Sequence, residues 1–139
     1  DSGTKIWYLN GKIHREDGPA MEYSNGTKCW CIDGNRHRED GPAIEYANND
    51  KAWYINGNPH REDGPAVEYG DSSKFWWING EMHREDGPAI ELANGDNYWW
   101  INGKELTEEE FNNRHNVELS LDEIANKFNI PLDKLRIKK

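Results

Sequence analysis

The sequence predicts a mainly β protein, in which a single-layer antiparallel β-hairpin repeat solenoid is followed by a small C-terminal helical cap. Three observations predict this fold class: a tryptophan recurs every 23 residues, a seven-residue box recurs with the same period, and each period contains two pairs of turn-forming residues. The repeat region is expected over residues 5–103, as four full repeats and half of a fifth, and the helical cap over residues 104–139.

The tryptophans mark the first strand of each repeat. Each opens the motif Trp-x-(Ile/Leu)-(Asn/Asp)-Gly, at Trp7, Trp30, Trp53, Trp76 and Trp99. The closing Asn-Gly or Asp-Gly pair accepts positive φ at both centres of a tight hairpin turn, so the chain should reverse there. A second reversal is expected at Asn25-Gly26, Asn48-Asn49, Asp71-Ser72 and Asn94-Gly95. Two reversals per repeat give two strands per repeat and keep all tryptophan strands pointing the same way.

The box His-Arg-Glu-Asp-Gly-Pro-Ala follows each of the first four tryptophan motifs without substitution. Its proline lacks an N–H donor, so a bulge or corner is expected there. In the structural interpretation, aspartate and arginine bind backbone groups of this corner and histidine packs beneath it. These residues are His14, Arg15, Asp17, His37, Arg38, Asp40, His60, Arg61, Asp63, His83, Arg84 and Asp86.

A metal site shared between boxes is excluded by spacing. Equivalent atoms of neighbouring two-strand repeats lie roughly 9–10 Å apart, whereas the ligands of one zinc ion lie within about 4 Å of each other. Contact between histidine and carboxylates of a single box stays open. We predict no metal and no cofactor.

Alternation along the strands predicts two faces. Trp53 and Ile55 are expected on a core face with Ile44 and Tyr46 of the preceding strand. The opposite face is also aromatic and carries a column of glutamates. Two interpretations are open: the sheet fills or curls over both faces, or this second face is a groove for a partner that bears Arg or Lys. The candidate partner-binding residues are Tyr54, Phe75, Trp77, Tyr98, Trp100, Glu45, Glu68 and Glu91.

The composition constrains the class of protein. The chain has 139 residues and a net charge of -9, from 17 basic and 26 acidic side chains. Leu, Ile, Val and Phe make up only about 17% of it, which is typical of disorder. The 7 Trp and 6 Tyr oppose that interpretation, because such rings each bury roughly 150–250 Å². The acidic balance disfavours broad nucleic-acid binding, which needs clustered Lys and Arg.

Other sequence features favour a cytoplasmic protein. No apolar run is long enough for a membrane span, and the first ten residues do not resemble an export signal. Cys29 and Cys31, the two cysteines, lie two residues apart on one expected strand, so a disulfide between them would not link distant parts of the fold. We interpret them as small apolar fillers in a reducing compartment.

After the repeats, the sequence predicts helices. Thr107 with Glu110 forms a capping box, Ser120 with Glu123 forms a second one, and Pro131 begins a short third segment. A solenoid needs an end piece over its last open strand, and these segments are expected to supply it.

The run Trp-x-x-Asn-Gly-Lys-x-His, at Trp7–His14, resembles the MORN repeat, which has a 23-residue period and two antiparallel strands per unit. Here the tryptophan-to-glycine spacing is one residue longer, and Arg-Glu-Asp-Gly-Pro-Ala replaces the usual Gly-x-Gly. The chain is more similar to the His-Arg-Glu-Asp-Gly-Pro-Ala repeat proteins of tailed bacteriophages and giant viruses, which also tend to end in a segment like Asn102–Phe111. MORN proteins are mostly protein-interaction scaffolds, some of them at phosphoinositide membranes. The acidic charge disfavours an anionic membrane.

These resemblances imply a non-enzymatic protein-binding repeat module. A phage origin would favour an inhibitor or adaptor that acts in the host cytoplasm on a host protein, such as a defence-system component. An identical box in every repeat argues against catalysis, because an active site needs one place where differently tuned groups converge. The alternatives are an acidic nucleic-acid mimic and a small-ligand (nucleotide) sponge. No direct nucleic acid and no membrane are expected as partners, and a homo-oligomer is compatible with the sequence.

Overall fold

The structure, a computed structural model, describes residues 3–114 and 121–134. The chain divides into two compact units, Asp1–Glu108 and Glu109–Lys139. The first unit contains the repeats and the second contains helices.

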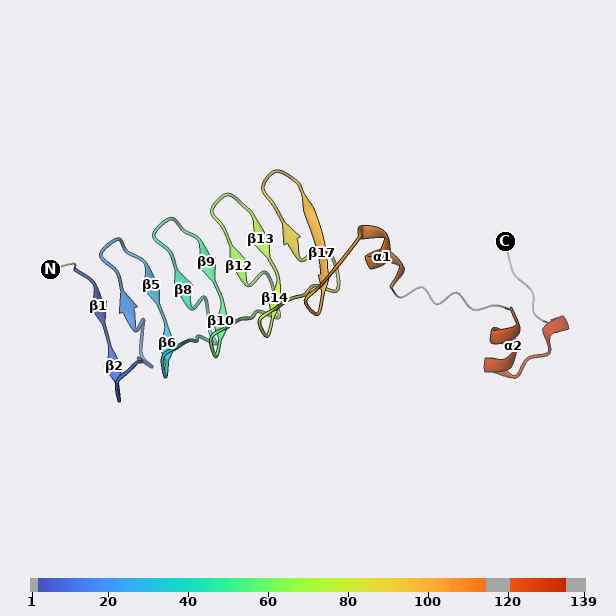
Figure 1. Cartoon of the computed structure of the whole chain (residues 1–139), viewed down its shortest axis with the longest axis horizontal. Coiled ribbons are helices and arrows are strands. Elements are labelled where there is room, and N and C mark those ends of the chain that lie inside the picture. The colour runs from blue at the N-terminus through green and yellow to red at the C-terminus, as the bar shows by residue number, and fades with distance from the viewer. Residues whose placement is uncertain (1–2, 115–120, 135–139) are drawn as a thin grey trace. The chain divides into compact units, whose positions relative to one another are not determined.

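The repeats form one antiparallel sheet of ten short strands, in which each strand is hydrogen-bonded to its neighbours in the order β1-β4-β5-β8-β9-β12-β13-β16-β17-β18. In Figure 1 these strands stand side by side in chain order, from blue to orange. The mainly β repeat fold that the sequence predicts is therefore confirmed. The strands are β1 (Lys5–Ile6), β4 (Met21–Glu22), β5 (Lys28–Cys29), β8 (Ile44–Glu45), β9 (Lys51–Ala52), β12 (Val67–Glu68), β13 (Lys74–Phe75), β16 (Ile90–Glu91), β17 (Asn97–Ile101) and β18 (Lys104–Leu106).

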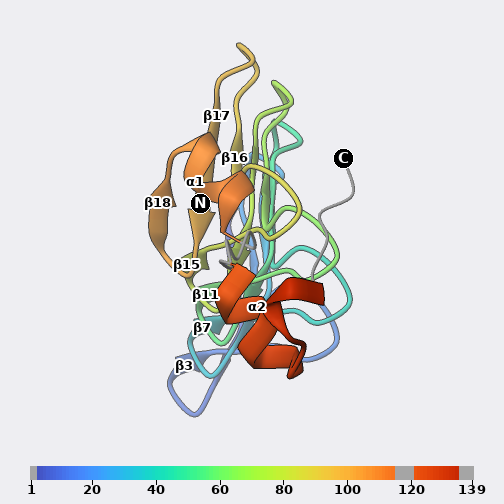
Figure 2. The same ribbon diagram turned by 90° about the vertical axis from the view of Figure 1, so that its right-hand side faces the viewer.

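Four further hairpins lie side by side at one end of the strands of this sheet (Figures 1 and 2). Each continues a tryptophan strand past its tryptophan and turns at the Asn-Gly or Asp-Gly pair. Neighbouring hairpins are joined by backbone hydrogen bonds: Gly57 N–H donates to the Arg36 carbonyl at 2.8 Å and Arg38 N–H to the Tyr54 carbonyl at 3.1 Å. The hairpins are β2 (Tyr8–Leu9) with β3 (Lys12–Ile13), β6 (Cys31–Ile32) with β7 (Asn35–Arg36), β10 (Tyr54–Ile55) with β11 (Asn58–Pro59), and β14 (Trp77–Ile78) with β15 (Glu81–Met82).

The first reversal of each repeat is the predicted two-residue turn. Asn56 has φ 50° and Gly57 has φ 84°, and the equivalent pairs in the other repeats are also left-handed at both positions. These angles are those of a type I′ turn, whose twist matches the flanking strands. The fifth such turn, at Asn102-Gly103, leads into β18, so the last hairpin extends three residues beyond the expected end of the repeat region.

The second reversal occurs where it is predicted but is one residue longer. Tyr46 N–H donates to the Asp50 carbonyl at 3.0 Å, and Asn49 N–H donates to the Tyr46 carbonyl at 3.0 Å. The loop therefore contains three residues, of which the last, Asn49, is left-handed at φ 69°. A three-residue loop with this geometry is common in hairpins. The expectation had assumed a two-residue turn at Asn48-Asn49.

That one residue changes the pairing register and therefore the faces. Ile44 pairs with Ala52, and Glu45 pairs with Lys51. A shift of one residue moves each side chain of a strand to the other side of the sheet. The expectation that Ile44 shares a face with Trp53 was therefore wrong, and so was the expectation that Glu45, Glu68 and Glu91 share a face with the second set of rings.

We name the two sides by their contents. The box face carries the tryptophans Trp7, Trp30, Trp53 and Trp76, the four boxes and the glutamates that follow them. The core face carries the apolar residues that pair across the strands, such as Ile44 with Ala52 and Val67 with Phe75. The first three repeats supply a buried cluster, which consists of Ala20, Cys29, Cys31, Ile44 and Ala52.

In the part of the chain that the structure describes, the helices match all three predicted segments. Helix α1 (Glu108–Asn113) begins directly after the expected cap Thr107. Helix α2 (Leu121–Phe128) follows Ser120, which lies outside the described residues. Asn129 is left-handed at φ 51° and ends α2, and Pro131 precedes the short helix η1 (Leu132–Lys134).

Candidate functional site

The arginine of each box makes four contacts on the box face. The Arg61 guanidinium lies 4.0 Å from the centre of the Trp53 ring. Its Nε donates to Asp63 at 2.8 Å, and its Nη1 donates to the Pro65 carbonyl at 3.3 Å and to Glu68 at 2.9 Å. The arginine thus fixes its own box corner to the tryptophan and to the next strand. We call this set of contacts the arginine clasp.

The clasp recurs in all four boxes. Arg15, Arg38 and Arg84 lie 4.3, 4.1 and 3.9 Å from the rings of Trp7, Trp30 and Trp76. The contact to the following glutamate shortens along the chain, from 3.9 Å at Arg15–Glu22 through 3.2 Å at Arg38–Glu45 to 2.6 Å at Arg84–Glu91. Glu45, Glu68 and Glu91, which the sequence assigns to a partner, thus bind arginines of the same chain.

The clasp also sets the ionisation of the box aspartates. The hydrogen bond from Arg61 and then its positive charge lower the pKa of Asp63 below the ordinary value. Asp17, Asp40 and Asp86 have their pKa values lowered in the same way by their own arginines. These four carboxylates are therefore charged and already paired at neutral pH.

The histidine of each box links its repeat to the next one. Asn79 N–H donates to Nδ1 of His60 at 3.1 Å, and Asn102 N–H donates to Nδ1 of His83 at 3.1 Å. Because Nδ1 accepts, the ring proton of the neutral histidine belongs on Nε2. On that side, Nε2 of His60 lies 3.8 Å from Glu62.

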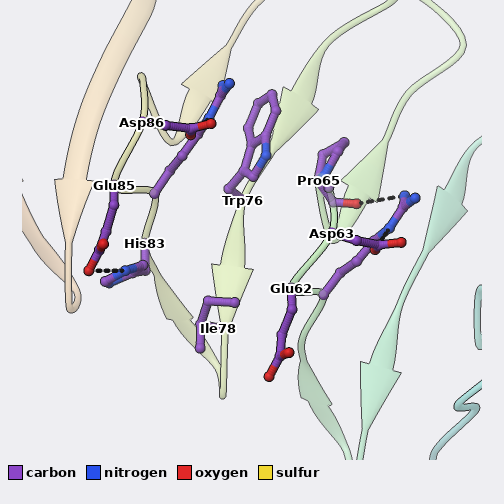
Figure 3. A pocket seen from close by; sticks show the side chains of 11 residues that line it. Glu62, Asp63, Pro65, Trp76, Ile78, His83, Glu85 and Asp86 are labelled. Atoms are coloured by element: carbon purple, nitrogen blue, oxygen red, sulfur yellow. Dashed lines mark hydrogen bonds and ion pairs between the residues drawn. The ribbon is translucent and has the colours of Figure 1, made fainter.

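A pocket of about 520 Å³ lies between the third and fourth boxes. Figure 3 shows Trp76 and Ile78 between the two boxes, with Glu62 and Asp63 on one side and Glu85 and Asp86 on the other. The pocket therefore combines an apolar strip with two rims, each of which carries two carboxylates and one arginine, Arg61 or Arg84, and is acidic overall. The Glu62 side chain is 86% exposed, so its charge faces solvent at the rim.

Two equivalent pockets precede this one. Boxes one and two enclose about 490 Å³ around Trp30 and Ile32, and boxes two and three enclose about 680 Å³ around Trp53 and Ile55. Each pocket has the same acidic residues on its rims, because each rim is one copy of the box. The three pockets form a row across the box face, which we call the acidic groove.

The core face brings together the five rings that the sequence singled out. They are Tyr54, Phe75, Trp77, Tyr98 and Trp100; the Tyr98 residue is 40% exposed and the other four are half-buried. Tyr69 meets Phe75 edge to face, with 5.5 Å between ring centres. Nε1 of Trp100 is buried without a hydrogen-bond partner. The rings thus pack on the sheet, without the carboxylates expected beside them.

Cys29 and Cys31 are buried on the core face, with 3.6 Å between their sulfur atoms. The hydrogen bond from Cys31 lowers the pKa of Cys29 to about 7, and the same contact raises the pKa of Cys31. Within residues 3–114 and 121–134, no three His, Cys, Asp or Glu residues are arranged to hold a metal ion.

Sequence reasoning missed the pocket-lining set Glu16, Glu39, Glu62 and Glu85. A signal for them exists in the sequence. The structural interpretation gives the histidine, arginine, aspartate and proline of the box a role but leaves its invariant glutamate without one. A residue that is repeated without a packing role is a candidate for binding.

Comparison with known protein families and with curated proteins finds no match for this chain. In the described part of the chain, none of the helices reaches the length and apolar character that crossing a membrane requires.

Proposed function

We propose that this protein is a non-enzymatic protein-binding repeat module whose docking surface is the acidic groove. The observation that carries the proposal is the row of three equivalent pockets, each with a tryptophan and an isoleucine between acidic rims. Aromatic contact area beside charge is the usual composition of a binding hot spot. The resemblance to phage and giant-virus repeat proteins supports a host protein as the partner and a role as inhibitor or adaptor.

Repetition of the site favours binding over catalysis. Three pockets with the same residues can engage one long partner at several points, and linked contacts increase the overall affinity. A catalytic site instead needs differently tuned groups at one place. The aspartates on the rims are each bonded to their own arginine at 2.7–2.8 Å, so they are occupied by the clasp.

The same pairing weakens the nucleic-acid mimic as an alternative. With the aspartates held by arginines, each box leaves one exposed glutamate to represent a phosphate, roughly every 9–10 Å. Duplex DNA carries one charge per about 1.7 Å of its axis. The groove thus has too low a charge density for close mimicry. Its acidic rims also repel nucleotides, which disfavours a nucleotide sponge.

Affinity capture from a host lysate tests the proposal with three forms of the chain. The groove variant is Glu39→Gln, Glu62→Gln and Glu85→Gln. The control variant is Glu81→Gln, Glu105→Gln and Glu109→Gln, which removes the same charge from exposed positions that do not line the pockets. Circular dichroism checks that all three forms are folded.

We expect a stoichiometric protein that the wild type and the control retain and the groove variant loses. Equal retention by both variants would contradict the groove as the docking surface. Capture of nucleic acid alone, with steep salt dependence, would favour the mimic and reject the protein-binding module.

A further inference from the structure

The spacing of the three pockets specifies the shape of the partner segment. This inference rests on the proposed function and concerns the same groove. Neighbouring pockets are one repeat apart, which is two strands of the same sheet. Two strand spacings amount to roughly 9–10 Å. A segment that fills all three pockets must therefore present three equivalent side chains at this interval and on one side.

Regular backbone conformations differ in whether they meet this condition. In an extended β-strand, three residues span about 10 Å, but the side chains at i and i+3 point to opposite sides. In an α-helix, the side chains at i and i+7 lie on one side, but they are about 10.5 Å apart, which is longer than the pocket spacing, so the mismatch grows from one pocket to the next. The helix is also about 10 Å wide, which makes it bulky for a row of such pockets. A polyproline II helix has three residues per turn and rises about 9.3 Å in one turn. Its side chains at i, i+3 and i+6 therefore match the groove in both spacing and direction.

The lining of each pocket specifies the side chain. Glu62 and Glu85 stand on opposite rims of the pocket that contains Trp76 and Ile78 (Figure 3). Lysine and arginine place an apolar stem against such a strip and keep a cationic head at its rim. On each rim the box arginine is outnumbered by carboxylates: Arg61 binds Asp63 and Glu68, and Arg84 binds Asp86 and Glu91, so Glu62 and Glu85 add negative charge beyond these pairs.

We infer that the acidic groove binds a polyproline II segment of a partner protein that carries Lys or Arg at every third position. Three successive basic side chains enter the three pockets, one beside each of Trp30, Trp53 and Trp76. The proline-rich residues between them lie over the box corners. Aromatic-lined grooves commonly bind polyproline II segments, because little conformational entropy is lost when a preformed helix docks.

Two synthetic peptides of identical composition test this inference with the full chain. The first is a proline-rich nonapeptide with lysine at positions 2, 5 and 8, and the second has the same residues with lysine at positions 4, 5 and 6. Both are labelled with fluorescein and titrated with protein at physiological salt, and anisotropy reports binding. We expect the spaced peptide to bind at least about tenfold more tightly, because only it can engage three pockets at once.

The groove variant and the control variant locate the site. The preference for the spaced peptide should disappear in the variant with Glu39→Gln, Glu62→Gln and Glu85→Gln, and should persist in the variant with Glu81→Gln, Glu105→Gln and Glu109→Gln. Equal affinity of wild type for the two peptides would overturn the inference. Displacement of the spaced peptide by spermine at equal charge concentration would also overturn it, since a flexible polycation has no helical spacing.

The outcomes separate the inference from the function on which it rests. If capture finds a groove-dependent protein but the spaced peptide has no advantage, the partner segment is of another kind and the binding module stands. If neither capture nor peptide binding depends on the groove glutamates, both proposals are rejected.

Discussion

The two faces of the sheet use their repeats in opposite ways. On the box face, four copies of one sequence make four copies of one set of contacts, and the arginine-to-ring distance varies only from 3.9 to 4.3 Å. On the core face, the position of Ala52 is taken by Ile6, Cys29, Phe75 and Tyr98 in the other repeats. Exposure of that position is 42% at Ile6, 2% at Cys29 and Ala52, and 40% at Tyr98.

The difference shows which physical requirement keeps a repeat invariant. The box contains a corner whose proline carbonyl and charged side chains must all be satisfied, and one geometry does so. A sheet face in a single layer only needs apolar contact area, which side chains of different size can supply. The box sequence is therefore identical in each repeat because all of its polar groups must be bonded. The apolar positions of the core face can differ in size from repeat to repeat.

The largest effect is expected from Ile44, the largest side chain in the buried cluster of the core face. Ile44→Ala removes a residue that is 3% exposed and opposes both Cys29 and Ala52. We expect a loss of about 3 kcal/mol in the free energy of unfolding, measured by urea titration. Ile90→Ala, at the equivalent position two repeats later but only half-buried, should cost about half as much. Equal losses would show that burial does not differ along the core face.

A smaller loss is expected from opening one clasp. Arg61→Ala leaves the Pro65 carbonyl and Glu68 without the donor shown here and uncovers one side of Trp53. The free energy of unfolding should fall by about 2 kcal/mol, because charged hydrogen bonds are lost together with a cation–π contact. Arg84→Ala in the fourth repeat is the matched variant and should lose the same amount. If the two losses of unfolding free energy differ by more than about 1 kcal/mol, the boxes do not stabilise the fold equally.

The histidine link between repeats should contribute less. His60→Ala removes the acceptor for Asn79 N–H, and we expect a loss of about 1 kcal/mol in unfolding free energy. His60→Asn offers an oxygen acceptor at a similar distance from the backbone, so it should recover part of that loss. If alanine and asparagine destabilise equally, the hydrogen bond to Nδ1 is not what stabilises the junction.

The smallest effect is the response of the box aspartates to acid. Their pKa values are lower in the folded chain than the ordinary unfolded value of about 3.9, because arginine donates to them. Their contribution to stability is therefore complete above about pH 4 and is lost as the pH falls through the folded pKa. Asp63→Asn should flatten the acid side of the stability profile slightly, as measured by urea titration from pH 5 to pH 2.5. An unchanged slope would mean that this pair does not stabilise the fold.

Much of the fold was predictable because its signals are local. The Asn-Gly and Asp-Gly turns, the corner at the proline and the start of α1 after Thr107 each depend on a few adjacent residues. The candidate site was less predictable. The rings of the core face were found, but the glutamates placed beside them lie on the other face. The face on which a side chain lies depends on the strand register, and the register depends on the length of the loop. The sequence Ala47–Asp50, with Asn48-Asn49 at its centre, does not reveal whether the loop contains two or three residues.

The sequence by itself determined the 23-residue period, the two reversals in each period and the absence of a regular ladder at the box, since these follow from φ preferences and from the missing proline N–H. Only the tertiary structure decided that Glu68 binds Arg61 and that Glu62 and Glu85 stand across one pocket. Those contacts join residues 7 and 23 positions apart, so they depend on the strand register and on the stacking of one repeat against the next.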